Sequence, residues 1–340
     1  MSKRRLFRWP ARRTAALGIL ALLVTSVLSW LICGGDSYDP QPGMSSFGPT
    51  SAPASLSGTI EEYFNPIHEQ LSEITKTYDN ATSEIGLVLA ATRAEDLTWL
   101  LDYCNDHGTI PFIYSTDVEP APNLLVPYTI RGREATAYLS FVVEFYNQLP
   151  KYTIFIHSNY DQWHNDLFGP HTGPALRNLR LEAVDAQGYV NLRCEHDPGC
   201  PTSVHPWSPT QIDIENDDIR AFFPQVYQTL LNVPAKKVPE HIGNVCCGQF
   251  AVSRQRILER PRSDYERMLR WADETELTDS FGVGWVYEKI WHIIFGMDEI
   301  YCPRYEQCRC DAYGWCGPLA SGETLQAVRA NPGSTMGPSF

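Results

Sequence analysis

The sequence predicts an α/β domain whose mostly parallel sheet carries helices on both faces, with one transmembrane helix before it. Three short apolar runs, at residues 85–91, 109–114 and 152–156, have the length and composition of buried strands. Helical patterns separate them, one opening at Glu95 and one over residues 131–149. This alternation is typical of a parallel sheet. Ligands bind at the carboxyl ends of such strands, so the residues there are the first candidates for a site.

Composition limits the classes of protein and of partner. The chain has 340 residues, of which 43% are hydrophobic and 20% are charged. This balance excludes a mainly disordered chain, a collagen-like repeat and a coiled coil. The net charge of −13 argues against nucleic acid as a partner, because binding to phosphates needs a basic surface.

The amino terminus has the features of a signal-anchor. Residues 1–13 carry basic side chains and no acidic one, and residues 14–33 carry no charge at all. A helix of that length spans about 30 Å, the hydrocarbon thickness of a bilayer, whereas the apolar part of a cleaved signal peptide has only about 7–15 residues. The basic flank places the amino terminus in the cytosol. We therefore expect a single-pass type II membrane protein, with a cleaved signal as the alternative.

The remaining chain is expected in the lumen of the ER or Golgi, or outside the cell. A segment rich in Gly, Pro and Ser after the anchor is typical of a flexible stem. The predicted organisation is a cytosolic tail at 1–13, a membrane anchor at 14–33, a stem at 34–83, a luminal domain at 84–318 and a disordered tail at 319–340.

Cysteine usage agrees with an oxidising compartment. Ten cysteines are present, but no C-x2-C pair, the usual signal for zinc, so disulfides are the favoured interpretation. Nine follow the anchor, and an odd number leaves at least one thiol free or paired between chains. We expect the last four to attach residues 302–316 to the end of a helix at 284–295. Asn80, in the N-x-T sequon, is expected to carry a glycan. The cysteines expected in disulfides are Cys194, Cys200, Cys302, Cys308, Cys310 and Cys316.

Polar side chains follow the third predicted strand directly, at the edge where ligands bind. His157, Asn159 and Asp161 alternate along this segment, with Trp163 and His164 after them. The residue types suit a divalent metal, with His157 and Asp161 as ligands, and His164 is a candidate catalytic residue. The alternative is a loop of hydrogen-bonding residues with Trp163 packed on the domain.

A second candidate lies at the predicted strand over residues 247–253. Gly248 allows close approach of a ligand to the backbone, Gln249 suits a sugar hydroxyl, and Arg254 suits a phosphate. The alternative is a buried strand that ends in a helix cap. The acidic run at 213–218 is interpreted as the solvated start of a helix rather than as a metal site.

The third candidate is Glu288, which lies among aromatic residues on the helix predicted at 284–295. Glu288 and His292 are four residues apart, and Glu288 and Trp291 three apart, so each pair shares a helix face. Burial among aromatic rings would raise the pKa of this carboxyl toward use as a general base, and aromatic walls suit sugars. The alternative is a helix salt bridge beside an aromatic core stripe.

Five sequence motifs stand out: R-G-R-E at 131–134, F-I-H at 155–157, W-H at 163–164, C-C-G-Q-F-A-V-S-R at 246–254 and E-x-x-W-H-x-I-F-G at 288–296. Taken together, they resemble a fungal family of single-pass and secreted proteins whose domain is formally of unknown function. The resemblance covers about residues 84–316. A more distant similarity is to the GT-A glycosyltransferases, which bind a metal with a D-x-D motif that this chain lacks.

The GT-A similarity implies a domain that transfers a sugar from a nucleotide donor to a glycan or small-molecule acceptor. Mn²⁺ or Mg²⁺ is the candidate cofactor. Arg133 or Arg254 would contact the diphosphate and Glu288 would act as the base of an inverting reaction. One alternative is a tailoring enzyme of fungal secondary metabolism, or a metal hydrolase that uses His157, Asp161 and His164. Another is a non-catalytic surface protein held together by disulfides.

Overall fold

The structure, a computed structural model, describes residues 65–316. The predicted cytosolic tail, the anchor at 14–33, most of the stem and the carboxyl-terminal tail lie outside the described residues. Among the helices of the described part, none has the length and apolarity that a membrane span needs.

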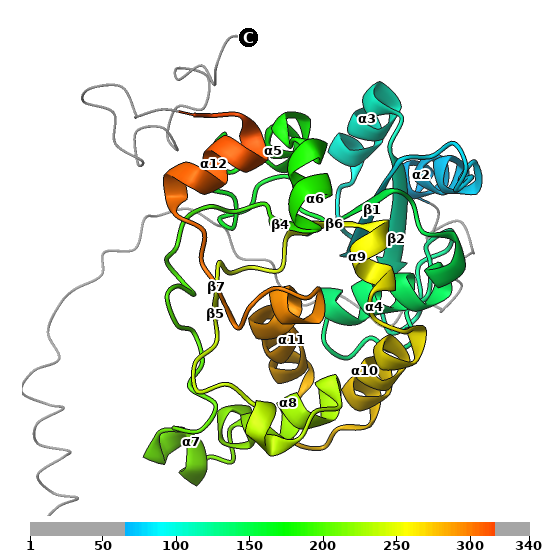
Figure 1. Cartoon of the computed structure of the whole chain (residues 1–340). Coiled ribbons are helices and arrows are strands. Elements are labelled where there is room, and N and C mark those ends of the chain that lie inside the picture. Colours follow the sequence, from blue (N-terminus) through cyan, green and yellow to red (C-terminus); the bar gives the residue numbers. More distant parts are fainter. Residues whose placement is uncertain (1–64, 317–340) are drawn as a thin grey trace, which may run out of the picture. The chain divides into compact units, whose positions relative to one another are not determined.

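A five-stranded sheet lies at the centre of the domain. Its order is β2-β1-β3-β6-β4 (Figure 1). β1 is parallel to β2 and β3, while β6 is antiparallel to both of its neighbours, β3 and β4. The sheet is therefore mostly parallel, as predicted, with one reversed strand. The strands are β1 (Ile85–Ala91), β2 (Ile110–Ser115), β3 (Tyr152–Phe155), β4 (Tyr189–Asn191) and β6 (Phe250–Ser253).

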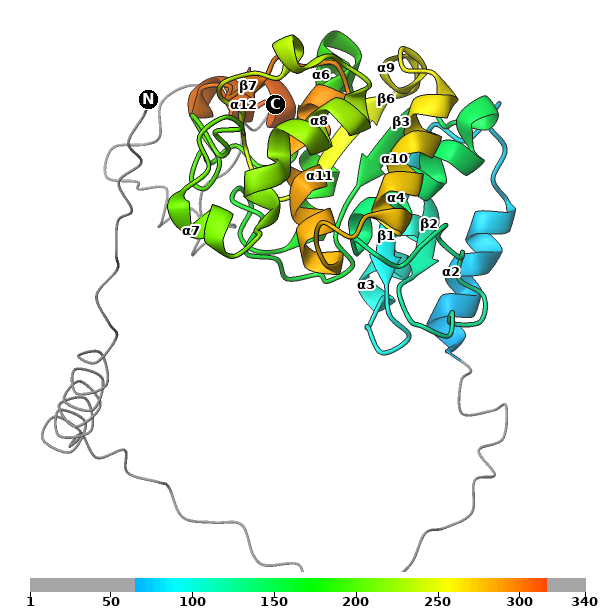
Figure 2. The ribbon, with the colours of Figure 1, turned by 90° about the horizontal axis from the view of Figure 1, so that it is seen from below.

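Helices cover both faces of this sheet, which confirms the predicted mixed α/β fold (Figure 1, and Figure 2 from below). On one face lie α4 (Glu134–Glu144), α8 (Phe223–Leu231), α10 (Arg262–Glu274) and α11 (Ser280–Ile294). On the other lie α3 (Thr98–His107), α5 (Thr172–Asn178), α6 (Leu181–Gln187) and α12 (Tyr305–Tyr313).

Shorter elements complete the domain. Two strands, β5 (Gly243–Asn244) and β7 (Ile300–Tyr301), form a separate parallel pair. The others are α2 (Pro66–Lys76), α7 (Gln211–Glu215), α9 (Arg254–Leu258) and the 3₁₀ helices η2 (Tyr146–Gln148), η3 (Ile219–Phe222) and η4 (Ala235–Lys237).

Alternation along the strands divides the core into two clusters. Successive side chains of a strand point to opposite faces. Val88 therefore packs under α4 and α11, while Leu87 and Leu89 pack under α3. In the same way Phe250 and Ala251 of β6 belong to different clusters. Burial on both faces explains why these strands read as continuous apolar runs in the sequence.

The domain begins before the predicted boundary at residue 84. Helix α2 packs on β2 and α3, and its Leu71 and His68 are buried. Asn65 caps the helix by accepting hydrogen bonds from the N–H groups of Ile67 and His68. The predicted stem therefore ends earlier than expected, and its last part is a helix of the domain.

No single helix runs through residues 215–231. Residues 219–222 form η3, and α8 follows with Pro224 in its first turn, where the missing N–H of proline needs no partner. The acidic run ends α7 instead of opening one long helix. Asp213 and Thr210 form a capping box, which explains this carboxylate without a metal.

Disulfides join distant parts of the chain. Cys194 is bonded to Cys308 and Cys200 to Cys302, with sequence separations of 114 and 102 residues. The expected attachment of residues 302–316 to the end of α11 is therefore wrong: α12 is held to the loop after β4. The other bonded pairs are Cys310–Cys316 and the adjacent Cys246–Cys247, and Cys104 is a buried free thiol.

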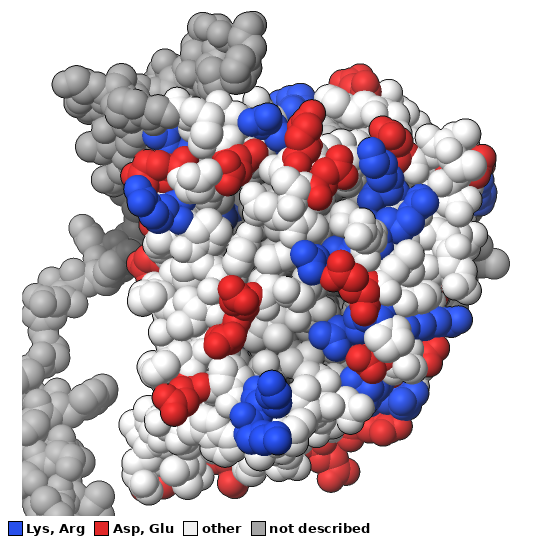
Figure 3. All heavy atoms as spheres, viewed as in Figure 1, with Lys and Arg blue, Asp and Glu red and all other residues white. Residues whose placement is uncertain are grey.

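Acidic and basic side chains are interspersed on the face of the domain shown in Figure 3. Along α10, Arg262 and Glu266 form an ion pair in which both side chains are exposed. Ion pairs of this exposed kind contribute little to stability.

Removing one long bridge should destabilise the domain strongly. Because the Cys194–Cys308 bridge remains, the Cys200–Cys302 bridge closes an additional ring made of residues 194–200 and 302–308, and a ring of about 15 residues contributes about 3 kcal/mol by restricting the unfolded chain. We expect the double variant Cys200→Ser, Cys302→Ser to lose about this much unfolding free energy in urea titrations. Cys104→Ala, which removes no bridge, is the control and should lose far less. Non-reducing peptide mapping that recovers Cys200 and Cys302 as free thiols would contradict the pairing.

Candidate functional site

A cleft of about 840 Å³ opens at the carboxyl edge of the parallel strands. Its walls come from the segments that follow β1, β2 and β3 and from the first turns of α4 and α11. It therefore lies where the topology predicts a ligand site. Six of the residues singled out from the sequence line this cleft: Arg133, His157, Asn159, Trp163, His164 and Glu288.

The reversed strand β6 fixes the position of His157. Because β6 is antiparallel to β3, the residues that precede it reach the carboxyl end of β3. The backbone N–H of His157 donates to Oε1 of Gln249 at 3.2 Å, and its Nε2–H donates to the carbonyl of Cys247 at 2.9 Å. Cys247 and Gly248 both have positive φ, and glycine adopts such a backbone easily.

Gln249 is buried and does not line the cleft, contrary to the expectation that it binds substrate. Its amide connects two segments, because Nε2 also donates to Oδ1 of Asn165 at 3.0 Å. Gly248 is likewise absent from the cleft wall. Gly248 and Gln249 therefore support the residues of the cleft instead of contacting a ligand.

His164 is a neutral imidazole beside His157. The two rings lie 4.6 Å apart between centroids. Burial lowers the pKa of His164 to about 4, and the charges of His157 and Arg193 act in the same direction. At neutral pH this ring is therefore suited to hydrogen bonding rather than to carrying a proton.

Two buried charged groups hold the segment that carries Trp163 and His164. Arg193 donates to the carbonyls of Trp163 and His164, at 3.2 and 3.1 Å. Asp166 accepts the backbone N–H groups of Cys194 and Glu195, at 2.9 and 2.6 Å. Burial raises the pKa of Asp166, and these hydrogen bonds oppose the rise. The loop after β3 is thus tied to the loop after β4.

Arg133 stands on a tightly constrained turn before α4. Gly132 and Arg133 both have positive φ, 90° and 55°. A Cβ on Gly132 would lie 2.7 Å from Val283 of α11, so only glycine fits there. Gly132 N–H donates to Ser280 Oγ at 3.0 Å. Arg133 is exposed at the cleft, and its backbone has an uncommon conformation. Strained backbone of this kind occurs often at functional sites.

Glu288 lines the cleft from the third turn of α11, and its side chain is 33% exposed. Its Oε1 accepts from Nζ of Lys289 at 2.7 Å. The aromatic residues around Glu288 were expected to form walls for a sugar, but Trp291 does not. Trp291 is buried against Tyr138 and Phe250 in the core, so it is not a ligand-binding residue.

His292 is fully buried although it lies one turn from Glu288. Its Nε2 faces the carbonyl of Glu299 at 3.2 Å, and Nδ1 has no hydrogen-bond partner among the described residues. Burial lowers its pKa to about 4. It is a core residue rather than a partner of Glu288.

Two further expected site residues lie elsewhere. Arg254 follows the carboxyl end of β6. Because β6 is antiparallel to β3, this end lies beside the amino end of β3, away from the cleft. There the backbone N–H of Arg254 donates to the carbonyl of Lys151. Asp161 pairs with His171 at 2.5 Å. His157 and Asp161 are thus engaged separately, and within residues 65–316 no three His, Cys, Asp or Glu side chains are grouped to hold a metal.

The sequence reasoning missed several residues of the cleft. Glu95 and Glu134 add carboxylates, and Phe281 adds an aromatic ring that is 59% exposed. Glu134 is the last residue of the quoted R-G-R-E motif, so the signal was present there. No sequence motif indicated Phe281 as a site residue, because only the fold brings the start of α11 to the ends of the strands.

The buried histidines should make stability depend on pH. The pKa of His292 in the folded protein, about 4, lies below the ordinary value of 6.5, so the unfolded chain binds a proton first as the pH falls. The contribution of His292 to the unfolding free energy is present above pH 6.5 and is lost toward pH 4. Between pH 7 and pH 5 the loss of unfolding free energy due to His292 is about 2 kcal/mol. In urea unfolding, His292→Leu should lose less stability over this interval than the wild type. An identical loss in both proteins would contradict the assignment.

Comparison with known proteins gives one match. No curated protein and no solved structure matches the chain. The family described as "Protein of unknown function (DUF3431)" matches residues 87–311, which run from β1 through most of α12 and include every residue of the cleft. The chain therefore belongs to the uncharacterised DUF3431 family.

Proposed function

We propose that the cleft binds a nucleotide sugar and transfers the sugar to an acceptor hydroxyl. The main support for the proposal is that Arg133, His157 and Glu288 all line one cleft at the carboxyl ends of the parallel strands. These residues come from three distant parts of the chain and supply a cation, a hydrogen-bonding ring and a carboxylate. A polar substrate with an anionic part fits this set.

The anionic part of the donor is expected at Arg133. This exposed guanidinium lies 5.3 Å from the ring centroid of Phe281 and makes no hydrogen bond or ion pair with any of residues 65–316. The amino-terminal turns of α4 and α11 line the same region, and the dipole of a helix favours an anion at that end. A diphosphate has the charge and the oxygen acceptors for this position.

The sugar is expected between the aromatic side chains at the cleft. Trp163 and Phe281 line it and are 66% and 59% exposed. Large exposed aromatic side chains in a cleft favour binding, because a ligand that covers them removes apolar surface from water. The apolar face of a sugar ring provides such a cover while its hydroxyls remain available to Asn159 and His164.

Glu288 is the proposed general base. Its carboxylate accepts the proton of the acceptor hydroxyl while that oxygen attacks the anomeric carbon of the sugar. The bond from this carbon to the diphosphate oxygen breaks, and the nucleoside diphosphate leaves with the electron pair, beside Arg133. Attack opposite the leaving group inverts the configuration at the anomeric carbon.

The described residues do not fit the expected Mn²⁺ or Mg²⁺ cofactor. His157 donates to a backbone carbonyl and Asp161 is bound to His171, so the two expected ligands do not form a pair. The same separation argues against a metal hydrolase that uses His157, Asp161 and His164. The proposed reaction therefore involves no metal held by these residues.

Nucleotide sugars should stabilise the protein without added metal. We expect UDP- or GDP-sugars to raise the melting temperature of the full-length protein, because a ligand that binds only the folded state shifts the unfolding equilibrium. Arg133→Gln should reduce this shift. Arg262→Gln, on the outer surface of α10, is the matched control. If no member of a panel of nucleotide sugars shifts the melting temperature, with or without Mn²⁺, the proposal fails.

Glu288→Gln should separate binding from turnover. The amide keeps the shape of the side chain but cannot accept a proton, and loss of a general base typically lowers the rate about 10²–10⁴-fold. Donor binding should stay within a few-fold of wild type. Glu306→Gln, on the exposed start of α12, should leave the rate unchanged, whereas His157→Ala should weaken donor binding. Unchanged turnover in Glu288→Gln would remove this residue from the mechanism.

A further inference from the structure

A disulfide between neighbouring residues lies at the turn before β6. Cys246 and Cys247 are adjacent in the chain and bonded to each other, and both are buried. The ring that this bond closes consists of the two side chains and the peptide group between them. Rotation about the Cα–C bond of Cys246 and about the N–Cα bond of Cys247 is therefore rotation within the ring. The bridge restricts two backbone angles directly, ψ of Cys246 and φ of Cys247.

One of these two angles has an unfavourable value. Cys247 has a φ of 94°. Few residues other than glycine have a positive φ, because Cβ then comes too close to a backbone carbonyl oxygen. An open chain with cysteine or serine at this position favours a negative φ. Without the bridge we therefore expect φ of Cys247 to change sign, which turns the carbonyl of this residue away from its present direction.

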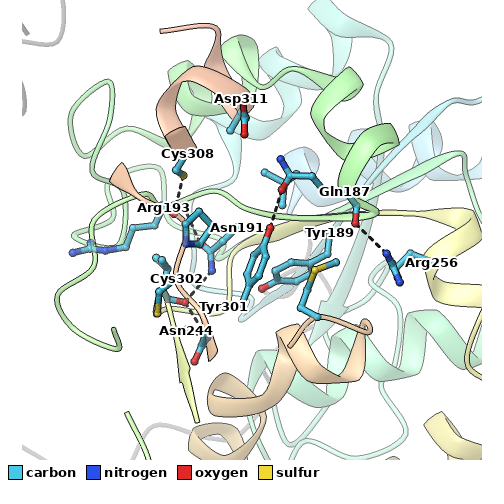
Figure 4. A pocket seen from close by; sticks show the side chains of 15 residues that line it. Gln187, Tyr189, Asn191, Arg193, Asn244, Arg256, Tyr301, Cys302, Cys308 and Asp311 are labelled. Atoms are coloured by element: carbon cyan, nitrogen blue, oxygen red, sulfur yellow. Dashed lines mark hydrogen bonds between the residues drawn. The ribbon is translucent and has the colours of Figure 1, made fainter. Parts of the chain in front are cut away.

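The chain is held on both sides of this turn. The carbonyl of Val245 accepts hydrogen bonds from the buried amides of Asn191 and Asn244, at 3.0 and 2.9 Å (Figure 4). After the turn, Phe250 begins β6 and pairs with both neighbouring strands, β3 and β4. Because both ends are fixed, the conformation of the turn decides where the carbonyl of Cys247 points.

This carbonyl sets the hydrogen-bonding state of His157, which lines the cleft. It accepts from Nε2 of the ring at 2.9 Å. A carbonyl oxygen can only accept, so Nε2 carries the hydrogen, and Nδ1 of the neutral ring keeps its lone pair. Nδ1 has no hydrogen-bond partner among residues 65–316, and it is not enclosed by the protein. The ring therefore offers an acceptor nitrogen that a ligand can reach.

We propose that the Cys246–Cys247 disulfide is a positioning element of the cleft. It holds the carbonyl of Cys247 against Nε2 of His157. This contact fixes the ring as the Nε2–H tautomer, whose Nδ1 accepts a hydrogen bond from a hydroxyl of the ligand. That the hydroxyl belongs to a nucleotide sugar rests on the proposed function, whereas the effect of the disulfide on the ring does not.

The tautomer of His157 can be read by NMR of the full-length protein with ¹⁵N-labelled histidine, because a ring nitrogen that carries hydrogen has a different shift from one that does not. At pH 8 the wild type should show His157 with hydrogen on Nε2, in signals that disappear in His157→Gln. The double variant Cys246→Ser, Cys247→Ser should show a mixture of both tautomers. Cys310→Ser, Cys316→Ser removes another bridge between cysteines close in sequence and should leave these signals unchanged. Hydrogen on Nδ1 in the wild type, or wild-type signals in the first double variant, would overturn the proposal.

Glycine in place of Cys247 tests the cause. Glycine adopts a positive φ easily, so Cys246→Ser, Cys247→Gly should return His157 toward the wild-type tautomer although the bridge is absent. A general loss of stability would affect the serine and the glycine variant alike, because both lack the same bridge. Equal spectra of the two variants contradict the role of φ. If the serine variant does not fold, the wild-type tautomer and its recovery in the glycine variant decide the question.

Ligand affinity gives an independent measurement. The probe is the nucleotide sugar that raises the melting temperature most. By calorimetry, Cys246→Ser, Cys247→Ser should bind it about five-fold more weakly than the wild type, the difference that one neutral hydrogen bond makes. The glycine variant and Cys310→Ser, Cys316→Ser should stay close to the wild type. Wild-type affinity in a serine variant whose tautomer has changed rules out Nδ1 as a ligand acceptor. If no nucleotide sugar binds, the proposed function fails, and the NMR comparison still decides whether the disulfide sets the ring.

Discussion

The antiparallel pairing of β6 with β3 is the constraint on which the candidate site depends. Four strands of the sheet run in one direction, and β6 runs against them between β3 and β4. The start of β6 therefore lies beside the end of β3. Gln249 and the carbonyl of Cys247 hold His157 at that point. A parallel β6 would have carried these groups to the opposite edge, where Arg254 now lies.

The other wall of the cleft depends on close packing between α4 and α11. The absence of a side chain at Gly132 lets the turn before α4 approach Val283. Arg131 secures this approach by donating to the carbonyls of Asp273 and Thr278, at 2.7 and 2.8 Å. The position of Arg133 therefore follows from backbone contacts around it. These contacts hold the turn before α4 against α11, which fixes one wall of the cleft.

The sequence predicted β1, β2 and β3 well because local pattern determines them, whereas the short strands β4, β5 and β7 were not predicted. Residues 85–91 form a strand with the expected bounds, and Pro111 lies in β2 at the sheet edge, where a missing N–H is tolerated. The direction of a strand in a sheet does not follow from its local sequence. Arg254 was therefore expected at the cleft, although it lies at the opposite ends of the parallel strands. Burial is not local either: the helix spacing that joins Glu288 and Trp291 does not reveal that the first lines a cleft and the second lies in the core.

The two long disulfides have a consequence for the order in which the protein is made. Cys194 and Cys200 leave the ribosome about one hundred residues before Cys308 and Cys302. Until then, the loop that anchors Trp163 and His164 through Arg193 and Asp166 lacks its covalent partners. The central sheet is complete in the nascent chain once Ser253 has emerged. Locking of the cleft wall is thus a late event of biosynthesis, because it needs the cysteines in and just before α12.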